Sequence, residues 1–374
     1  MPKDFNTEFP QSEDIIYLNH AGTGVWPKRT ADAIKAFAEE NMRLGASHYP
    51  AWIETEHELR KNIKALINAP SVDDIALLKN TSEALSVVAY GIDWVKGDNI
   101  VTSNQEFPSN RIVWESLHDK GVEFREADLS RQATPEDSLF ALVDKNTRMI
   151  TISAVQFASG LRMDLGRIGQ FCREHDILFC VDAIQHVGAL SIDVQAIQAD
   201  FVMADGHKWM LGPEGLALLY VHSDQREQLK LHQFGWHMVE HPHDFTVRYW
   251  EPAHSGRRFE CGSPNMLGIF GLNASISLLL EIGTKNIEIN NINNSKYLID
   301  SINNNPNLEL LSSADKNRLS GIVVFRHKQH DSTELHQRLM KAGVICAPRG
   351  GGIRFSPHFY TSTDKLDRAL AYLS

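Results

Sequence analysis

Short apolar runs alternate with longer amphipathic stretches between residues 72 and 225. The apolar runs read "DIALL", "NIVTS", "RMITISAV", "ILFCVDAIQ", "DFVMADG" and "LALLYV". Among them stand stretches with helical spacing, such as "EALSVVAYGI", "NRIVWESLHDKG" and "DLGRIGQFCREHD". An alternation of this kind is typical of βα units around a mostly parallel sheet. The pattern predicts an α/β fold, in which residues 15–260 form a large α/β/α domain on that sheet.

The apolar pattern changes after residue 260. The segment "GSPNMLGIFGLNASISLLLEIG" has the apolar spacing and small residues of a helix, so we expect residues 261–290 to link two domains. The asparagine-rich stretch that follows also keeps apolar residues at helical spacing, which predicts a helix and its loop although asparagine is a poor helix former. Beyond it, the order β, α, β, β, α predicts a small α+β domain over residues 291–374, with residues 1–30 packed near it.

Composition and charge narrow the classes of function. The chain has 374 residues with 47 acidic and 37 basic side chains, and no basic run stands out, so nucleic acid is not an expected partner. Four cysteines without CxxC spacing predict neither a disulfide framework nor a metal site. The N-terminus is polar, and no apolar run approaches the roughly 20 residues that cross a bilayer. We expect a cytoplasmic protein with no membrane partner.

Lys208, in "DGHKWMLGPEG", is the first candidate for chemistry, because an ammonium among Trp209, Met210 and Leu211 is costly to bury unless it is paired or covalently used. A surface lysine is the alternative. Asp182 ends the apolar run "LFCVD", and carboxyl ends of parallel strands face one crevice, although a helix cap is the alternative there. A lysine that forms a Schiff base with pyridoxal phosphate, and an aspartate that keeps the pyridine nitrogen protonated, would explain both burials.

With these two residues in place, the sequence resembles the class V aminotransferase family of fold-type I pyridoxal phosphate enzymes, which includes the cysteine desulfurases. The resemblance spans nearly the whole chain and rests on several motifs in a fixed order. In sequence they read "YLNHAGTGVWP", "NTSEAL", "EFPSN", "VDAIQHVGA", "DGHKWMLGPEG", "RRFECGSPN" and "IRFSPHFYTS". The resemblance implies a cofactor, pyridoxal 5'-phosphate, and a small-molecule amino acid substrate.

The resemblance also implies a phosphate site. Thr81 and Ser82 match the family's phosphate loop, where backbone amides at a helix N-terminus and a hydroxyl hold the anion, with an ordinary helix cap as the alternative. His207 matches the histidine before the Schiff-base lysine, which is usually read as a phosphate contact. Gly262 and Ser263 match the turn that reaches the phosphate of the neighbouring subunit. We therefore expect a homodimer with shared active sites.

The cofactor ring and the substrate have their own expected contacts. Phe107 stands where the desulfurases commonly place a histidine that stacks on the ring, and Gln185 matches the residue that bonds the phenolic oxygen. A core phenylalanine is the alternative for Phe107. Arg354 matches the arginine that binds the substrate α-carboxylate, with a surface ion pair as its alternative, and Gln156 matches an asparagine that helps to hold the same group. His20 is a candidate contact for the substrate side chain.

One departure from the desulfurase pattern concerns the catalytic cysteine. The desulfurases carry a nucleophilic cysteine on a mobile loop upstream of the carboxylate-binding arginine, whereas Cys346 stands in what looks like a strand, so we expect a packed thiol. The sequence therefore predicts a lyase, of the C–S lyase or desulfurase-like type, without a loop cysteine nucleophile. A class V aminotransferase or an amino acid epimerase is the alternative, since all of these begin with loss of the α-proton. A non-catalytic module that binds the cofactor is the remote alternative.

Overall fold

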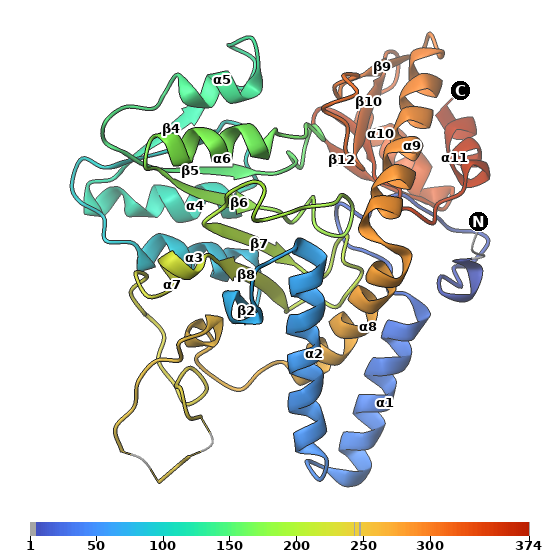
Figure 1. The fold of residues 1–374 in the computed structure, drawn as a ribbon. Coiled ribbons are helices and arrows are strands. Elements are labelled where there is room, and N and C mark those ends of the chain that lie inside the picture. The colour runs from blue at the N-terminus through green and yellow to red at the C-terminus, as the bar shows by residue number, and fades with distance from the viewer. Residues whose placement is uncertain (1–4, 243, 247, 374) are drawn as a thin grey trace.

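The computed structural model describes residues 5–242, 244–246 and 248–373. Its large domain is built on a seven-stranded sheet with the strand order β2-β8-β7-β6-β5-β3-β4 (Figure 1). The strands are β2 (Ile75–Leu78), β3 (Asn99–Ser103), β4 (Glu123–Ala127), β5 (Thr147–Ser153), β6 (Leu178–Asp182), β7 (Phe201–Asp205) and β8 (Ala217–Val221). Strands β3 to β7 pair in parallel, and β8 runs antiparallel to both β2 and β7. The α/β fold predicted from the sequence is confirmed.

Helices cover both faces of this sheet. Phe179 and Val181 of β6 pack into one core cluster with residues of α2, α6 and α8, while Cys180 packs into a second cluster with residues of α3. This alternation is what a strand buried on both faces requires. The helices of this domain are α1 (Lys28–Leu44), α2 (Tyr49–Ile67), α3 (Thr81–Gly91), α4 (Ser109–Glu115), α5 (Pro135–Phe140), α6 (Leu165–Glu174) and α7 (Ser223–Arg226), with the 3-10 turns η2 (Val72–Asp74), η3 (Ser116–Lys120) and η4 (Gly256–Phe259).

The small domain is an antiparallel sheet with the order β12-β13-β10-β9, covered by two helices. Its strands are β9 (Leu308–Leu310), β10 (Val323–His327), β12 (Ala347–Arg349) and β13 (Gly352–Phe355), and its helices are α10 (Ser332–Lys341) and α11 (Thr363–Leu370), followed by η5 (Ala371–Leu373). The N-terminal segment, which begins with η1 (Phe5–Thr7), joins this domain through β1 (Ile16–Tyr17), which pairs in parallel with β11 (Val344–Ile345). Residues 1–4 lie outside the described part of the chain.

Two helices link the domains, α8 (Met266–Ile282) and α9 (Thr284–Asn303), which meet at an angle of 83°. The asparagine-rich stretch forms α9, and buried asparagines there bind backbone carbonyls, since Asn291 donates to Ala189 and Asn294 donates to His358 and Thr361. These hydrogen bonds offset the low helix propensity of asparagine. No single described helix is long and apolar enough to cross a membrane, and only the bent pair α8 and α9 reaches that length and hydropathy together.

Candidate active site

Asp182 and Lys208 lie at the carboxyl edge of the large sheet. Asp182 is the last residue of β6 and is buried, with one oxygen accepting a hydrogen bond of 3.0 Å from the amide of Ile184. Burial raises the pKa of Asp182 to about 7. Lys208 follows β7, and burial lowers the pKa of its ammonium to about 8, although the charge of Asp182 opposes that shift. The two groups therefore titrate near neutrality in one crevice, which is typical of reactive sites.

Phe107 lies over the lysine. Lys208 Nζ is 5.6 Å from the centroid of the Phe107 ring, and Phe157 contacts the same ring edge-on at 5.1 Å. The Phe107 side chain is 40% exposed, so it is not the core residue that was its alternative reading. An exposed aromatic face beside a reactive lysine suits a flat ligand ring.

Gln185 and His20 lie beneath this crevice. The Gln185 amide donates to the carbonyl of Ala21 at 2.9 Å and accepts from the indole of Trp209 at 2.8 Å. The ring nitrogens of His20 lie 2.9 Å from the carbonyl oxygen of Ser356 and 2.8 Å from the hydroxyl of Tyr360, and burial lowers the pKa of His20 to about 4. Both ring nitrogens of His20 therefore already have partners within the protein. A contact between His20 and a substrate stays a prediction.

Gln156 is held by Glu106, a residue that the sequence reasoning missed. Glu106 is buried and accepts hydrogen bonds from Ser103, Asn110, Ser153 and Gln156. The Gln156 amide nitrogen donates to Glu106 at 3.0 Å, so the Gln156 oxygen stays buried without a partner. The charge of Glu106 also adds to the raised pKa of Asp182. Its position after β3, at the same sheet edge as Asp182, is the signal that could have identified it.

Arg354, on β13, reaches from the small domain to the large one. One guanidinium nitrogen donates to the carbonyl of Phe157 at 2.8 Å, and another lies 3.4 Å from the side-chain oxygen of Asn19, also missed from the sequence. Its Nε is buried without a partner, and within the described ranges no carboxylate lies at salt-bridge distance. Burial and the charge of Arg349 lower the pKa of Arg354 to about 10. The surface ion pair proposed as its alternative is therefore absent among the described residues.

The N-terminus of α3 offers donors for an anion. Asn80 caps the helix by accepting from the amide of Glu83, which leaves the amides of Thr81 and Ser82 free of intrahelical partners. The Thr81 hydroxyl is buried without a partner, and the Ser82 hydroxyl donates to Ser109 at 2.8 Å. Unpartnered buried atoms on Thr81, as on Gln156 and Arg354, are the polar groups that a ligand would satisfy.

His207 sits between these groups and β7. Its Nδ1 lies 2.7 Å from a carboxylate oxygen of Asp205, and the side chain is largely buried. Nδ1 is nevertheless buried without a hydrogen-bond partner, so it is one of the polar atoms that a ligand could satisfy.

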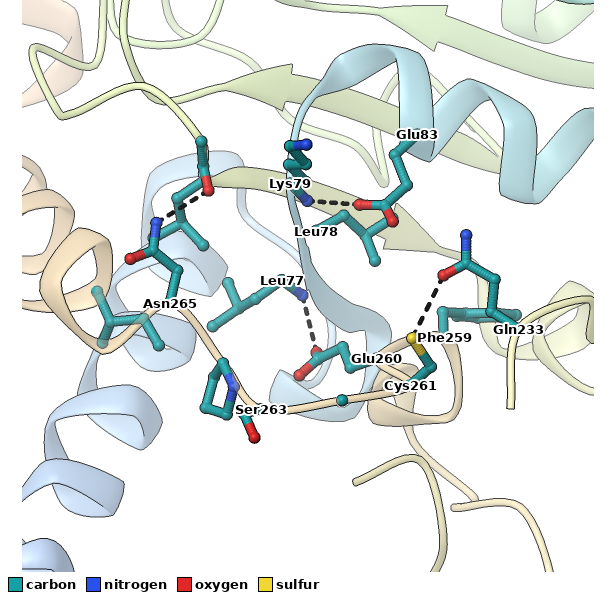
Figure 2. Close-up of a pocket in the computed structure, with 15 residues that line it drawn as sticks. Leu77, Leu78, Lys79, Glu83, Gln233, Phe259, Glu260, Cys261, Ser263 and Asn265 are labelled. Atoms are coloured by element: carbon teal, nitrogen blue, oxygen red, sulfur yellow. Dashed lines mark hydrogen bonds between the residues drawn. The ribbon is translucent and has the colours of Figure 1, made fainter. Parts of the chain in front are cut away.

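Gly262 and Ser263 lie apart from the lysine. They line a cavity of about 450 Å³ together with Lys79, Gln233 and Asn265 (Figure 2). Neither Lys208 nor Asp182 lines this cavity, and Ser263 is exposed. In a single chain, Phe107 and Asp182 lie near Lys208, whereas Gly262 and Ser263 line a separate cavity.

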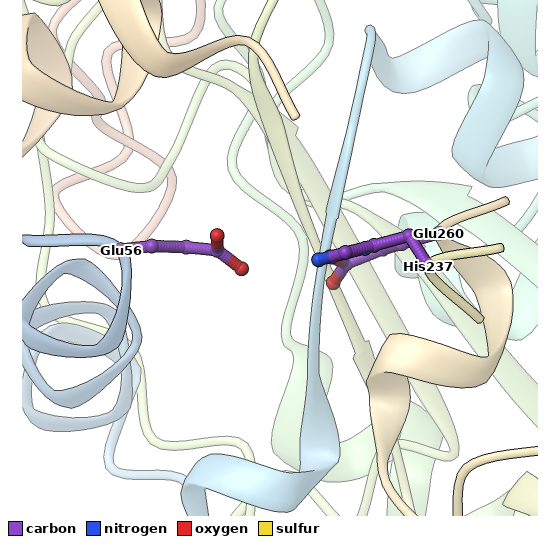
Figure 3. A group of neighbouring side chains, drawn as sticks. All are labelled: Glu56, His237 and Glu260. Atoms are coloured by element: carbon purple, nitrogen blue, oxygen red, sulfur yellow. The ribbon is translucent and has the colours of Figure 1, made fainter. Parts of the chain in front are cut away.

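Glu56, His237 and Glu260 form a second buried group of titratable side chains (Figure 3). Carboxylate and imidazole side chains of this kind can hold a metal ion. Arg60, however, already lies between the two carboxylates, at 2.6 Å from Glu56 and 2.7 Å from both oxygens of Glu260. Removing one member of such a buried ion network typically costs about 3–5 kcal/mol. The group therefore ties α2 to the segment after η4, and we assign it a structural role.

Comparison with known proteins agrees with this geometry. A family model described as aminotransferase class-V matches residues 16–368. A probable cysteine desulfurase of Methanothermobacter thermautotrophicus is 30% identical over 97% of this chain and 95% of its own length, and a cysteine desulfurase of Salmonella typhimurium is 28% identical over 88% and 82%.

Solved structures of the same fold include a complex of the cystine C-S lyase C-DES with its product cysteine persulfide. It has a TM-score of 0.90 and 23% identity, and the match covers 98% of both chains. A C-DES mutant with glycine covalently linked to the PLP cofactor has a TM-score of 0.92 and 22% identity, over 100% of this chain and 99% of that one. At these identities the structural matches show the fold.

The raised pKa of Asp182 predicts a pH dependence of stability in the protein without cofactor. The folded protein keeps the Asp182 proton up to about pH 7, whereas the unfolded chain releases it near 3.8, so this stabilisation is complete below 3.8 and is lost as pH rises to about 7. Relative to Asp182→Asn, the free energy of unfolding should fall by about 1 kcal/mol per pH unit across that range. Urea unfolding of the wild type and of Asp182→Asn at several pH values measures this change in the free energy of unfolding.

Asp119→Asn, at an exposed position in η3, is the matched control and should show no such trend. A difference between wild type and Asp182→Asn that does not change with pH would contradict the prediction.

Proposed function

The chain belongs to the class V aminotransferase family, and on that premise we propose that it is a pyridoxal 5'-phosphate-dependent lyase acting at the α-carbon of a sulfur-containing amino acid. The observation that carries this proposal is the position of Lys208, whose Nζ lies 5.6 Å from the centroid of the exposed Phe107 ring and whose charge interacts with that of buried Asp182. The relatives are named for removal of sulfur or cleavage of C–S bonds, which favours a lyase over an aminotransferase or an epimerase.

The residues of the crevice fit the cofactor. Lys208 would hold it covalently, Asp182 would pair with its ring nitrogen, and Phe107 would cover the ring, while Gln185 would meet the phenolic oxygen. Thr81 and Ser82, at the N-terminus of α3, and His207 would bind its phosphate. When bound, the cofactor supplies an electron-poor ring that stabilises negative charge at the substrate α-carbon.

Lys208 is suited to move the α-proton. With its pKa lowered to about 8, roughly a tenth of its amine is neutral at pH 7, far more than for an ordinary lysine, and a neutral amine accepts a proton. Arg354 would bind the substrate α-carboxylate through the nitrogens that have no acidic partner within the described residues. The Gln156 oxygen has no partner and, as an acceptor, would meet a donor group of a ligand. The substrate is thereby fixed with its α-carbon toward Lys208.

Cys346 supports a lyase without a cysteine nucleophile. It lies between β11 and β12, is 4% exposed, and burial raises the pKa of its thiol to about 12. Such a thiol carries almost no thiolate at neutral pH, and thiolate is the form that attacks sulfur. We propose that C–S cleavage proceeds by elimination.

A homodimer is part of the proposal. Gly262 and Ser263 lie outside the crevice of their own Lys208, where they are free to reach the phosphate of a second subunit. Near this turn, Phe234, Trp236 and Trp250 are exposed and line a cavity of about 430 Å³. Exposed clusters of aromatic side chains are typical of protein interfaces.

Lys208→Ala should lose the visible absorbance band that borohydride bleaches, and turnover should fall by at least about a hundredfold, because the covalent link and the proton acceptor are lost together. Absorbance scans and product release measure the two effects. Lys61→Ala, on the exposed side of α2, is the control and should keep both. Turnover at the wild-type rate in Lys208→Ala would refute the assignment.

The holoenzyme should sediment as a dimer, and dilution to monomer should weaken cofactor binding, since each phosphate would lose the donors of the partner turn. Ser263→Ala should weaken cofactor binding without changing the sedimentation of concentrated protein. A fully active monomer would argue against a shared site.

Cys346→Ser should retain most of the turnover, because a protonated, buried thiol takes no part in the reaction. Cys346→Ala is a second variant, because it removes the thiol without burying the hydroxyl that serine introduces. A loss of turnover in Cys346→Ser alone would then reflect the buried hydroxyl and not a catalytic role of the thiol. Mass spectrometry after incubation with cysteine should find no persulfide on any cysteine. Loss of sulfide release from both variants, with the cofactor still bound, would restore the desulfurase mechanism.

A further inference from the structure

Arg349 is a second arginine on the small-domain hairpin that carries Arg354. In the β12–β13 ladder, Ala347 pairs with Arg354 and Arg349 pairs with Gly352. Side chains two residues apart on a strand share a face, so Arg349 lies on the face of Arg354, at the diagonal position that separates Cβ atoms by about 7 Å. Gly352 opposite it has no side chain, and a Cβ there would lie 2.1 Å from the carbonyl oxygen of Phe325.

The tip of this hairpin docks beside the active site. A Cβ on Gly350 would lie 2.4 Å from the carbonyl oxygen of Ala158, and Gly350 has a φ of 62°, so only glycine suits this close approach. Phe157, the residue before Ala158, accepts the hydrogen bond from Arg354 and packs against Phe107. The docked turn therefore places Arg349 at the small-domain side of the crevice that holds Lys208.

The Arg349 guanidinium lacks an anionic partner there. Its hydrogen bond goes to the carbonyl of the adjacent Pro348, and in the part of the chain that the structure describes no carboxylate lies at salt-bridge distance. Its positive charge acts on both Arg354 and Lys208. If an α-carboxylate balances Arg354, the positive charge of Arg349 is left over beside it.

We propose that Arg349 binds a second anionic group, carried on the side chain of the amino acid substrate, so that the enzyme selects sulfur amino acids whose side chain ends in an acid. This inference rests on the proposed function and names the substrate class of the same site. A guanidinium suits a terminal carboxylate because it can donate two parallel hydrogen bonds to it.

S-carboxymethylcysteine and S-methylcysteine make the matched test, since they are both thioethers and differ in the side-chain carboxylate. We expect the holoenzyme to prefer S-carboxymethylcysteine in kcat/KM of pyruvate release. Arg349→Gln should lower the ratio of kcat/KM for S-carboxymethylcysteine to kcat/KM for S-methylcysteine by at least about tenfold, mainly through KM for S-carboxymethylcysteine. Arg349→Lys should recover part of the loss, because lysine restores the positive charge but not the paired N–H donors of a guanidinium.

Arg326→Gln is the control, because Arg326 is an exposed arginine on β10 of the same sheet, paired with Glu309. It should leave both substrates unchanged. Titration of each compound against the visible absorbance of the bound cofactor gives its affinity independently of turnover. The inference would be overturned if wild type and Arg349→Gln had the same preference between the two compounds, both in kcat/KM and in affinity from titration. The proposed lyase activity would then still stand. Absence of the visible band itself would instead refute the proposed function.

Discussion

The position of half-buried Lys208 near buried Asp182 is the constraint on which the site depends. Two opposite charges at one sheet edge lose hydration together, and each pKa moves toward neutrality as a result. The turn that carries the lysine is packed closely, because a Cβ on Gly24 would lie 2.0 Å from the carbonyl oxygen of Lys208. Gly24 also donates its amide to the carbonyl of His207 at 2.6 Å. The N-terminal segment therefore helps, together with β7, to fix the position of the Lys208 backbone.

The same N-terminal segment joins the two domains at the site. It pairs with the small domain through β1 and β11, and Asn19 lies beside the guanidinium of Arg354. Arg354 in turn binds the carbonyl of Phe157 in the large domain. The residues that would fix the substrate thus belong to both domains, so any change in domain packing changes the distance between the carboxylate-binding group and Lys208.

Much of this arrangement follows from local sequence, since the alternation of apolar runs indicated the parallel sheet and placed Asp182 and Lys208 at one edge. Strand β4, "EFREA", was not predicted, because an edge strand with charged and half-exposed side chains lacks a clear apolar signal. Glu106 was missed for a different reason. Its role comes from contacts with Ser153 and Gln156, which lie far along the chain, and local patterns carry no information about such contacts. The same holds for the hydrogen bonds that enclose His20.

The small-domain hairpin connects two features that look independent. Between Cys346 and Arg354 the chain is short and strand-bound, and its glycine turn rests on Ala158, so the thiol has no loop on which to reach the cofactor. A docked turn of this kind removes the freedom that persulfide transfer requires. It also holds the exposed Arg349 on the same face of the hairpin as Arg354. The geometry that disfavours a cysteine nucleophile is therefore the geometry that gives the site its additional positive charge.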